Sequence, residues 1–354
     1  LEGLLQSTKE NVVVLSDTPN TVIVVDHALM PKGAAGPRRS GSIVIAFFMS
    51  LGLGVGLSLL LKFMDDAVRT VEDVENAIKL PVIGAIPSSK GSLSIVRFIP
   101  LVGKLRTKNR DQGAALIVRH GDPSIQTESY LHMRTSLLLS NAGGPPRRLL
   151  ITSSQPTEGK TTTAINLATV LAQTGAKVLL IDADLRRPRV HLALDMSNQQ
   201  GLTTLLAGSN LEESDVLSTI VKCEEAGFFA LTSGPTSPNP ANLLGSPQMR
   251  TLLSTLDSAF DHIIIDSPPA VFFTDSVILS SLVEGVLLVV RSGESTRSVI
   301  QRGTKMFRDV GANVIGVVLN DMASSAQDYT HQNYGYRYEN HTQASAGDNT
   351  LGLT

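Results

Sequence analysis

Cysteine and aromatic residues are scarce in this sequence. Its 354 residues include one cysteine, Cys223, no tryptophan and five tyrosines. A single cysteine excludes a disulfide within the chain and offers no cluster of thiols for a metal. An excess of charge is also missing, since the formal net charge is −2 at pH 7. Because affinity for nucleic acid depends on neutralising phosphates, this balance argues against a general nucleic-acid-binding protein.

The sequence also lacks an initial methionine and a signal peptide, and it begins at Leu1 in the middle of a pattern. We therefore expect it to be the C-terminal part of a longer protein. With 42% hydrophobic and 18% charged residues, it is long enough for two domains with a buried core. Within residues 1–40, the β-branched runs 12–15 and 21–25 predict two strands around a turn.

One long apolar run lies near the start of the chain. Residues 43–61 contain no charged side chain, and Arg38, Arg39 and Lys62 flank them. At about 1.5 Å per residue, a helix of this length spans roughly 28 Å, close to the hydrocarbon thickness of about 30 Å. The alternative is a helix buried in a protein core. The basic ends and the unbroken run favour a transmembrane helix over residues 41–62.

Residues 63–120 are predicted to be a juxtamembrane linker. Within them, a short amphipathic helix is expected over 65–80 and a strand over 80–87. Residues 86–110 contain six basic residues and no acidic one, interleaved with apolar side chains. This composition suits either a tether that rests on anionic membrane lipid or a solvated basic linker.

From residue 121 onwards, helices alternate with apolar strands. Near-continuous apolar strands in this arrangement indicate an α/β fold, in which helices cover both faces of a parallel sheet. After an initial strand at 149–151, strands are predicted over Lys177–Asp182, Phe228–Thr232, His262–Asp266, Gly285–Val290 and Val314–Leu319. Helices are predicted over Glu128–Ser140, Pro247–Ala259, Asp275–Leu282 and Thr296–Val310.

The initial strand leads into a glycine-lysine-threonine turn that opens a predicted helix. Strand, loop, Gly-Lys-Thr and helix in this order are the context of a phosphate-binding loop. Its backbone N–H groups and the positive helix end would hold phosphate, while Lys160 would reach the outer phosphates and Thr161 would ligate Mg²⁺. The alternative is a helix that begins with these residues after an ordinary turn. The candidate nucleotide-binding residues are Ser154, Gln155, Pro156, Thr157, Glu158, Gly159, Lys160, Thr161 and Thr162.

Aspartates end two of the other predicted strands. Asp182 and Asp184 follow one apolar run, and Asp266 ends another. In an open parallel sheet, ligands bind at the carboxyl ends of the strands, and an aspartate there can hold Mg²⁺ directly or through water. A single aspartate can instead cap a helix, and Asp184 is a candidate for that role. The combination with Lys160 and Thr161 favours a nucleotide and magnesium site.

The C-terminal segment 323–354 concentrates a rare residue. Four of the five tyrosines lie within ten residues, at Tyr329, Tyr334, Tyr336 and Tyr338. Residues 340–354 are polar, which predicts a disordered end. An incidental aromatic tail is the alternative, and the clustering argues for a functional one.

These motifs resemble those of bacterial tyrosine kinases fused to polysaccharide co-polymerases. Residues 154–161, 182–184 and 266–269 are similar to the Walker A, A′ and B motifs of that family. The family is a deviant branch of the P-loop NTPases that also contains partition and division-site ATPases. Gln155 stands where those ATPase relatives carry a signature lysine. The resemblance implies a P-loop kinase domain over 121–322, preceded by the end of a periplasmic chain-length-determinant region over 1–40.

The resemblance also implies an activity, which is ATP-dependent autophosphorylation of the tyrosine cluster between subunits of a homo-oligomer. Lys160, Asp182 and Asp184 would be catalytic, and Asn320 matches a base-reading position. Thr161, Asp184 and Asp266 would hold Mg²⁺, so that ATP and Mg²⁺ are the expected cofactors.

The implied partners are the machinery of capsule or exopolysaccharide polymerisation and export, a cognate tyrosine phosphatase and membrane lipid, without nucleic acid. The expected location is the bacterial inner membrane. Because ATP and Mg²⁺ are cytoplasmic, the residues after 62 would face the cytoplasm.

One departure and two other functions qualify this resemblance. The family's ring-forming Glu-x-x-Arg-x-x-Arg helix here reads Glu128, Leu131 and Arg134, without its middle arginine. The chain could instead be a partition-type ATPase switch, against which Gln155 and the tyrosine cluster argue. It could also be a structural chain-length regulator with weak catalysis. The presence of Lys160, Asp182 and Asp266 argues against that alternative.

Overall fold

The computed structural model describes residues 3, 39–64, 66–88, 116–118, 124–140, 144–208 and 212–322. The chain divides into two compact units, residues 1–65 and residues 66–354. The strands predicted at 12–15 and 21–25, most of the basic segment 86–110 and the tyrosine cluster lie outside the described residues.

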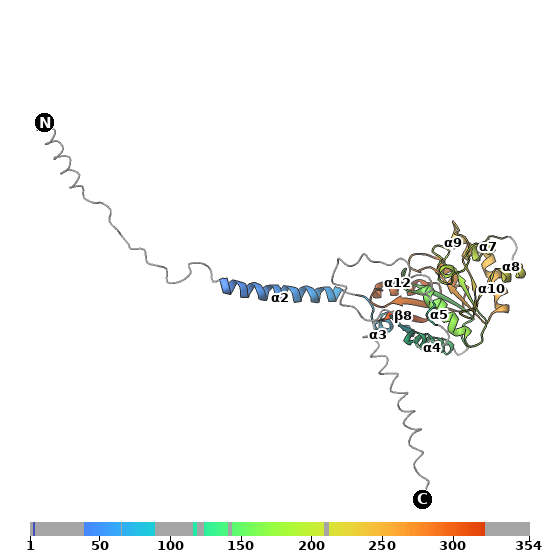
Figure 1. Ribbon diagram of the computed structural model, residues 1–354, viewed down its shortest axis with the longest axis horizontal. Coiled ribbons are helices and arrows are strands. Elements are labelled where there is room, and N and C mark those ends of the chain that lie inside the picture. Colours follow the sequence, from blue (N-terminus) through green and yellow to red (C-terminus); the bar gives the residue numbers. More distant parts are fainter. Residues whose placement is uncertain are drawn as a thin grey trace, which may run out of the picture. The chain divides into compact units, whose positions relative to one another are not determined.

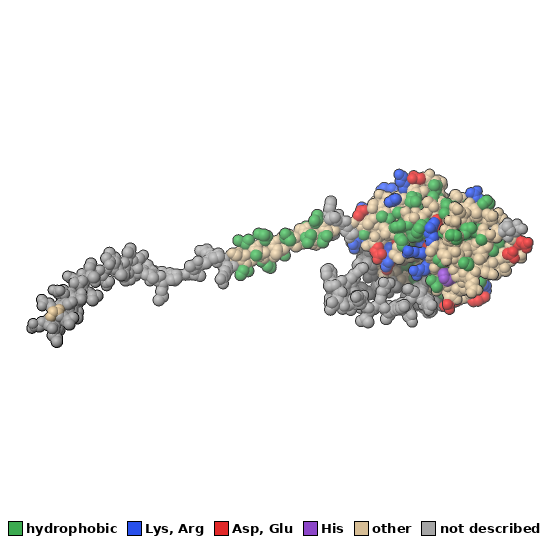
Figure 2. Space-filling model, turned by 90° about the horizontal axis from the view of Figure 1, so that it is seen from above, with side chains coloured by type: hydrophobic (Ala, Val, Ile, Leu, Met, Phe, Trp, Pro, Cys, Tyr) green, Lys and Arg blue, Asp and Glu red, His purple; other side chains and the backbone are tan. Residues whose placement is uncertain are grey.

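The first unit contains helix α2, Arg39–Met64. Its segment Gly41–Leu61 is long and apolar enough to cross a membrane, and none of it is buried in protein. Figure 2 shows hydrophobic side chains along this helix, and its large apolar residues are 52–73% exposed. Because apolar surface is disfavoured in water, a helix of this kind suits a lipid environment.

The second unit is built on an eight-stranded sheet in the order β1-β8-β7-β2-β6-β3-β5-β4. Every neighbouring pair is parallel except β4 with β5. The predicted parallel sheet is therefore confirmed, and the short edge strand β4 was missed because its three mostly exposed residues form no apolar run. The strands are β1 Val82–Pro87, β2 Arg148–Ser153, β3 Val178–Asp182, β4 Val221–Cys223, β5 Phe228–Leu231, β6 His262–Asp266, β7 Gly285–Arg291 and β8 Val314–Met322.

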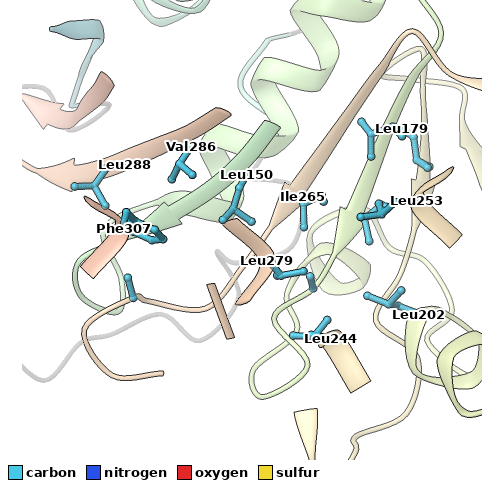
Figure 3. Close-up of a cluster of buried hydrophobic side chains, with 14 of the residues drawn as sticks. Leu150, Leu179, Leu202, Leu244, Leu253, Ile265, Leu279, Val286, Leu288 and Phe307 are labelled. Atoms are coloured by element: carbon cyan, nitrogen blue, oxygen red, sulfur yellow. The ribbon is translucent and has the colours of Figure 1, made fainter. Parts of the chain in front are cut away.

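Helices cover both faces of the sheet, as Figure 1 shows. Alternate residues of one strand enter different hydrophobic clusters: Leu179 and Ile181 of β3 face one, and Val178 and Leu180 face the other. Figure 3 shows part of the first cluster. The helices are α3 Val71–Ile78, α4 Ile125–Leu138, α5 Lys160–Ala172, α6 Val190–Ala193, α7 Leu202–Ala207, α8 Glu213–Thr219, α9 Pro240–Leu244, α10 Pro247–Ala259, α11 Asp275–Ser280 and α12 Arg297–Asp309.

Residues 66–88, assigned above to a juxtamembrane linker, belong to the second folded unit. β1 pairs with β8, and α3 buries Val74 and Ile78 in the first hydrophobic cluster. α3 is shorter than the helix predicted over 65–80, because extended Thr70 caps its start and left-handed Lys79 ends it. These elements resembled a linker because their sheet and helix partners lie far away in the sequence.

Candidate nucleotide-binding site

The phosphate-binding loop joins β2 to α5 and ends where Gly159 begins the helix. Gly159 has φ 97°, and a Cβ atom there would lie 2.0 Å from the Asn320 side-chain nitrogen. Only glycine therefore fits this position. The N-terminal N–H groups of α5 have no partners within the helix, which makes this end a site for anions.

The predicted aspartates meet beside this loop because their strands are neighbours. β6 lies between β2 and β3, and Asp266 pairs in register with Asp182 on one side and Ile151 on the other. Parallel strands bring their carboxyl ends to one edge of the sheet. Asp182, Asp184 and Asp266 are all buried there.

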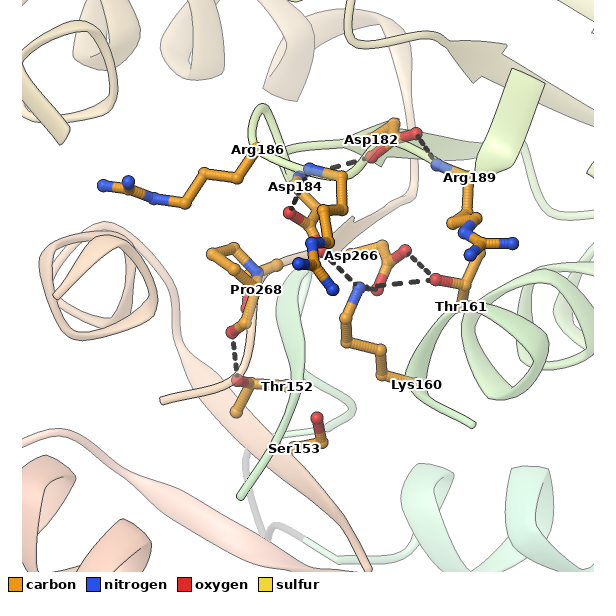
Figure 4. Close-up of polar contacts among 12 residues, drawn as sticks. Thr152, Ser153, Lys160, Thr161, Asp182, Asp184, Arg186, Arg189, Asp266 and Pro268 are labelled. Carbon is orange, nitrogen blue, oxygen red and sulfur yellow. Dashed lines mark hydrogen bonds and ion pairs between the residues drawn. The ribbon is translucent and has the colours of Figure 1, made fainter. Parts of the chain in front are cut away.

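Lys160 and Thr161 complete this polar cluster, which Figure 4 shows. The Lys160 ammonium lies 2.8 Å from Asp184 Oδ2 and 3.4 Å from Asp266 Oδ1. The Thr161 hydroxyl donates a hydrogen bond of 2.6 Å to Asp266 Oδ2. Aspartates from two strand ends, β3 and β6, thus converge on the start of α5.

Asp182 is held by backbone groups. Its Oδ2 accepts the N–H groups of Arg189 and Val190 at 3.1 and 3.0 Å, and its Oδ1 accepts the N–H of Asp184 at 3.2 Å. Asp184 Oδ1 also accepts the N–H of Arg187 at 3.0 Å. Asp184 therefore caps a turn rather than the helix considered for it above, and it pairs with Lys160 through its other oxygen.

Burial and crowding of like charges perturb the pKa values of this cluster. Burial, followed by the charge of Asp266, raises the pKa of Asp182 to about 7. Burial raises the pKa of Asp266 as well, against the opposing effect of Lys160. For Lys160, burial lowers the pKa, but Asp266 and Asp184 outweigh it and the net pKa is raised. Lys160 therefore stays protonated at neutral pH.

The donor set fits Mg²⁺. This cation prefers oxygen ligands, and the hydroxyl of Thr161 and the carboxylate of Asp266 lie side by side. Three buried carboxyl groups face one ammonium group, so a bound cation would offset the excess of negative charge. In the described ranges, no group of three or more His, Cys, Asp or Glu side chains is arranged as metal ligands. Mg²⁺ is usually held by one or two carboxylates together with substrate phosphates.

The back of the loop is held by side chains from β7, β8 and the segment after β7. The Asn320 side-chain amide donates to the carbonyl of Glu158 at 3.0 Å. The Glu158 carboxylate turns inward and accepts the N–H of Gln155 at 2.7 Å and the hydroxyl of Ser295. In this structure Asn320, predicted to read a base, contacts the loop itself.

The other loop residues are placed as follows. Ser154 is buried, and its hydroxyl has no hydrogen-bond partner among the described residues. Gln155 and Thr162 are half-buried, whereas Pro156 and Thr157 are exposed. Thr157 has φ 67°, a strained value for a β-branched residue that costs of order 1–3 kcal/mol.

Comparison with known proteins identifies the family. A family model described as ParA, NUBPL iron-transfer P-loop NTPase matches residues 146–352. The tyrosine-protein kinase YwqD of Bacillus subtilis (strain 168) is 37% identical over 213 residues, which cover 60% of this chain and 86% of that protein. The chain belongs to the bacterial tyrosine-protein kinases.

The resemblance stated from the motifs is thus confirmed, and further members of this kinase family agree. The tyrosine-protein kinase ptk of Acinetobacter johnsonii is 30% identical over 327 residues, which cover 92% of this chain but only 43% of that protein. The solved kinase domain of Escherichia coli tyrosine kinase ETK superposes with a TM-score of 0.58 at 30% identity, covering 70% of this chain and 92% of that domain.

The residues Glu128, Leu131 and Arg134, compared above with the ring-forming helix of the family, lie on α4. Glu128 is exposed, and Leu131 packs half-buried against the second hydrophobic cluster. The Arg134 guanidinium donates to the Val170 carbonyl at 2.9 Å. It therefore satisfies one of the carbonyl groups left open at the end of α5.

The motifs gave no sign of an ion pair beside the site between the partly exposed Arg186 and the buried Asp275. Arg186 donates to both carboxylate oxygens of Asp275 at 2.7 and 3.0 Å, and its guanidinium lies 4.4 Å from the centre of the Phe273 ring. Asp275 is fully buried. The only signal in the sequence was that Asp275 is an acidic residue at the start of the predicted helix 275–282. Arg186 lies 89 residues earlier in the chain, so no local pattern connects the two.

Proposed function

We propose that this chain is an ATP-dependent protein-tyrosine kinase. It would transfer the γ-phosphoryl group of ATP to Tyr329, Tyr334, Tyr336 and Tyr338 of a neighbouring copy in a homo-oligomer. The observation that carries this proposal is the convergence of Lys160, Thr161, Asp184 and Asp266 at the phosphate-binding loop. Membership of the kinase family supports a kinase over a partition-type ATPase.

The side chains would act mainly by position and charge, as phosphoryl transfer requires. Lys160 would move from the carboxylates to the β- and γ-phosphates, and the N–H groups at the start of α5 would hold the β-phosphate. Thr161, Asp266 and, through water, Asp184 would hold Mg²⁺, which when bound neutralises phosphate charge.

Asp182 is suited to receive the proton of the tyrosine hydroxyl. A base is most effective with a pKa near the working pH, and the pKa of Asp182 is raised to about 7. As the tyrosine oxygen bonds to the γ-phosphorus, the bond to ADP breaks and the proton passes to this carboxylate. The backbone bonds to Asp182 keep it in a single orientation.

Family membership and α2 support the wider setting that we propose. The chain spans less than half of the length of several relatives it matches, so the activity of the whole protein is part of this proposal. We place α2 in the bacterial inner membrane and the kinase unit in the cytoplasm. Phosphorylation would control capsule or exopolysaccharide chain length, polymerisation and export, because phosphotyrosines of about −2 charge repel each other across an oligomer. A cognate phosphatase would reverse it, and the basic segment 86–110 would contact lipid.

A labelling experiment tests the catalytic proposal. The full chain in detergent micelles is incubated with Mg²⁺ and ATP, and phosphotyrosine and ADP are measured together. Lys160→Met and a variant with phenylalanine at the four tail tyrosines are run beside it. We expect label in the parent and none in either variant. Release of ADP without label would favour the ATPase switch, and neither product would favour a structural regulator.

A further inference from the structure

Thr157 gives the phosphate-binding loop a conformation that the loop sequence alone does not favour. Its φ of 67° lies in the left-handed region, where a β-branched side chain is an outlier. The preceding Pro156 has no N–H with which to close the turn. Residues in such conformations persist only where the surrounding structure holds them. The shape of the loop therefore depends on side-chain contacts that hold Thr157 in this conformation.

Glu158 supplies the main internal contact. Its side chain is 3% exposed, and Oε2 accepts the N–H of Gln155 at 2.7 Å, which closes the loop across Pro156 and Thr157. A buried carboxylate close to an anion-binding loop repels phosphate and is costly to desolvate. The hydrogen bonds that it makes are the compensation visible in the structure.

Ser295 fixes the other carboxylate oxygen. The Ser295 hydroxyl accepts the N–H of Arg291 at 3.0 Å and directs its own hydrogen to Glu158 Oε1. Ser295 is 1% exposed, so water does not compete for this bond. Two further hydrogen bonds hold the loop backbone. The Asn320 side-chain amide donates to the Glu158 carbonyl at 3.0 Å, and the Arg291 guanidinium donates to the Thr157 carbonyl at 3.5 Å.

We propose that Glu158 is a positioning residue whose carboxylate, fixed by Ser295, clamps the strained loop in its phosphate-binding shape. This inference rests on the proposed nucleotide site, whose loop conformation Glu158 and Ser295 would maintain. Glu158 touches no reacting atom and acts through Gln155 and Thr157.

The test measures the affinity of the full chain in detergent micelles for a fluorescent ADP analogue with Mg²⁺. Glu158→Gln keeps the size of the side chain and removes its charge, and Ser295→Ala removes only the hydroxyl. We expect Kd to rise about tenfold in each, as for the loss of a hydrogen bond to a charged group. The double variant should bind about as weakly as either single one, because both remove the same clamp. Ser298→Ala, an exposed serine nearby, is the matched control and should bind like the parent.

A rescue separates positioning from general destabilisation. Glycine adopts the left-handed conformation without strain, so Thr157→Gly should restore most of the affinity lost in Glu158→Ala. Thermal melting identifies any variant that has unfolded. If a Glu158 variant is unfolded, the affinity of Ser295→Ala is compared with that of the parent instead. Parent-like affinity in Glu158→Gln and Ser295→Ala, or failure of glycine to rescue a folded Glu158→Ala, would overturn the proposal. A parent that binds the analogue without labelling tyrosine would contradict the proposed kinase activity and leave this inference standing.

Discussion

Replacing Lys160 with methionine is expected to destabilise the fold as well as to abolish phosphoryl transfer. The ammonium group lies 2.8 Å from Asp184 Oδ2 and 3.4 Å from Asp266 Oδ1, and both aspartates are buried. Methionine has a similar length and fills similar space without charge. The variant therefore leaves these carboxyl groups without their cation.

The magnitude follows from these distances. At an effective dielectric constant of about 20, unit charges 4 Å apart attract by roughly 4 kcal/mol, and both contacts here are shorter. Desolvation offsets much of that attraction, and removing one partner of a buried ion pair typically costs about 3–5 kcal/mol. A domain has a free energy of unfolding of only about 5–15 kcal/mol, so the loss is large.

The loss should also depend on pH. Without Lys160, the pKa values of Asp182 and Asp266, already raised by burial, rise further because the opposing positive charge is gone. The folded state then binds more protons than the unfolded state above the ordinary aspartate pKa of 3.8. Stability of the variant must therefore fall as pH rises from 5 to 8. The variant should lie closest to the parent near pH 5.

Thermal melting of the full chain in detergent micelles, followed by circular dichroism at pH 5, 6, 7 and 8, measures this effect. Lys160→Arg keeps a positive charge and is the matched control. Adding Asp184→Asn to Lys160→Met removes one carboxylate and should recover part of the lost stability. A Lys160→Met variant as stable as the parent at pH 8 would refute the reasoning. Any use of this variant as an inactive control must therefore include a melting curve.

Three further predictions concern the surroundings of the site. Arg186→Ala strands the buried Asp275 carboxylate and should lower the free energy of unfolding by about 3 kcal/mol, and Asp275→Ser in the same chain should recover part of it in urea titrations. Gly159→Ala has no room beside Asn320 and should abolish binding of the ADP analogue, an effect that Asn320→Ala should partly relieve if crowding is the cause. Burial raises the pKa of Glu158 from 4.5 to about 7, a shift equivalent to about 3 kcal/mol. The protonated form of Glu158 thus stabilises the fold below pH 4.5, and this stabilisation is lost as pH rises through 7. Glu158→Gln should therefore make the melting temperature depend less on pH over this range. An unchanged dependence on pH would contradict the prediction.

The elements with strong local patterns were predictable from the sequence. β2, β3, β6 and β7 are buried apolar runs, and α10 begins and ends at the predicted residues. Their patterns are local because burial on both faces of a sheet demands apolar side chains at consecutive positions. The phosphate-binding loop was equally readable, since its glycine, lysine and threonine each meet a chemical need at a set spacing.

The sequence by itself thus determined the α/β class and the kinase family, and it predicted the candidate site residues Lys160, Thr161, Asp182, Asp184 and Asp266, which the fold brings together. Tertiary structure alone decided which groups surround them. Residues 66–88 became part of the sheet unit because β1 pairs with β8, which lies more than 200 residues later in the chain. Glu158 became a clamp because the fold brings Ser295 behind the loop, and Asp275 became the partner of Arg186 in the same way. Such contacts join residues far apart in the chain, and their energies depend on burial that exists only once the sheet has assembled.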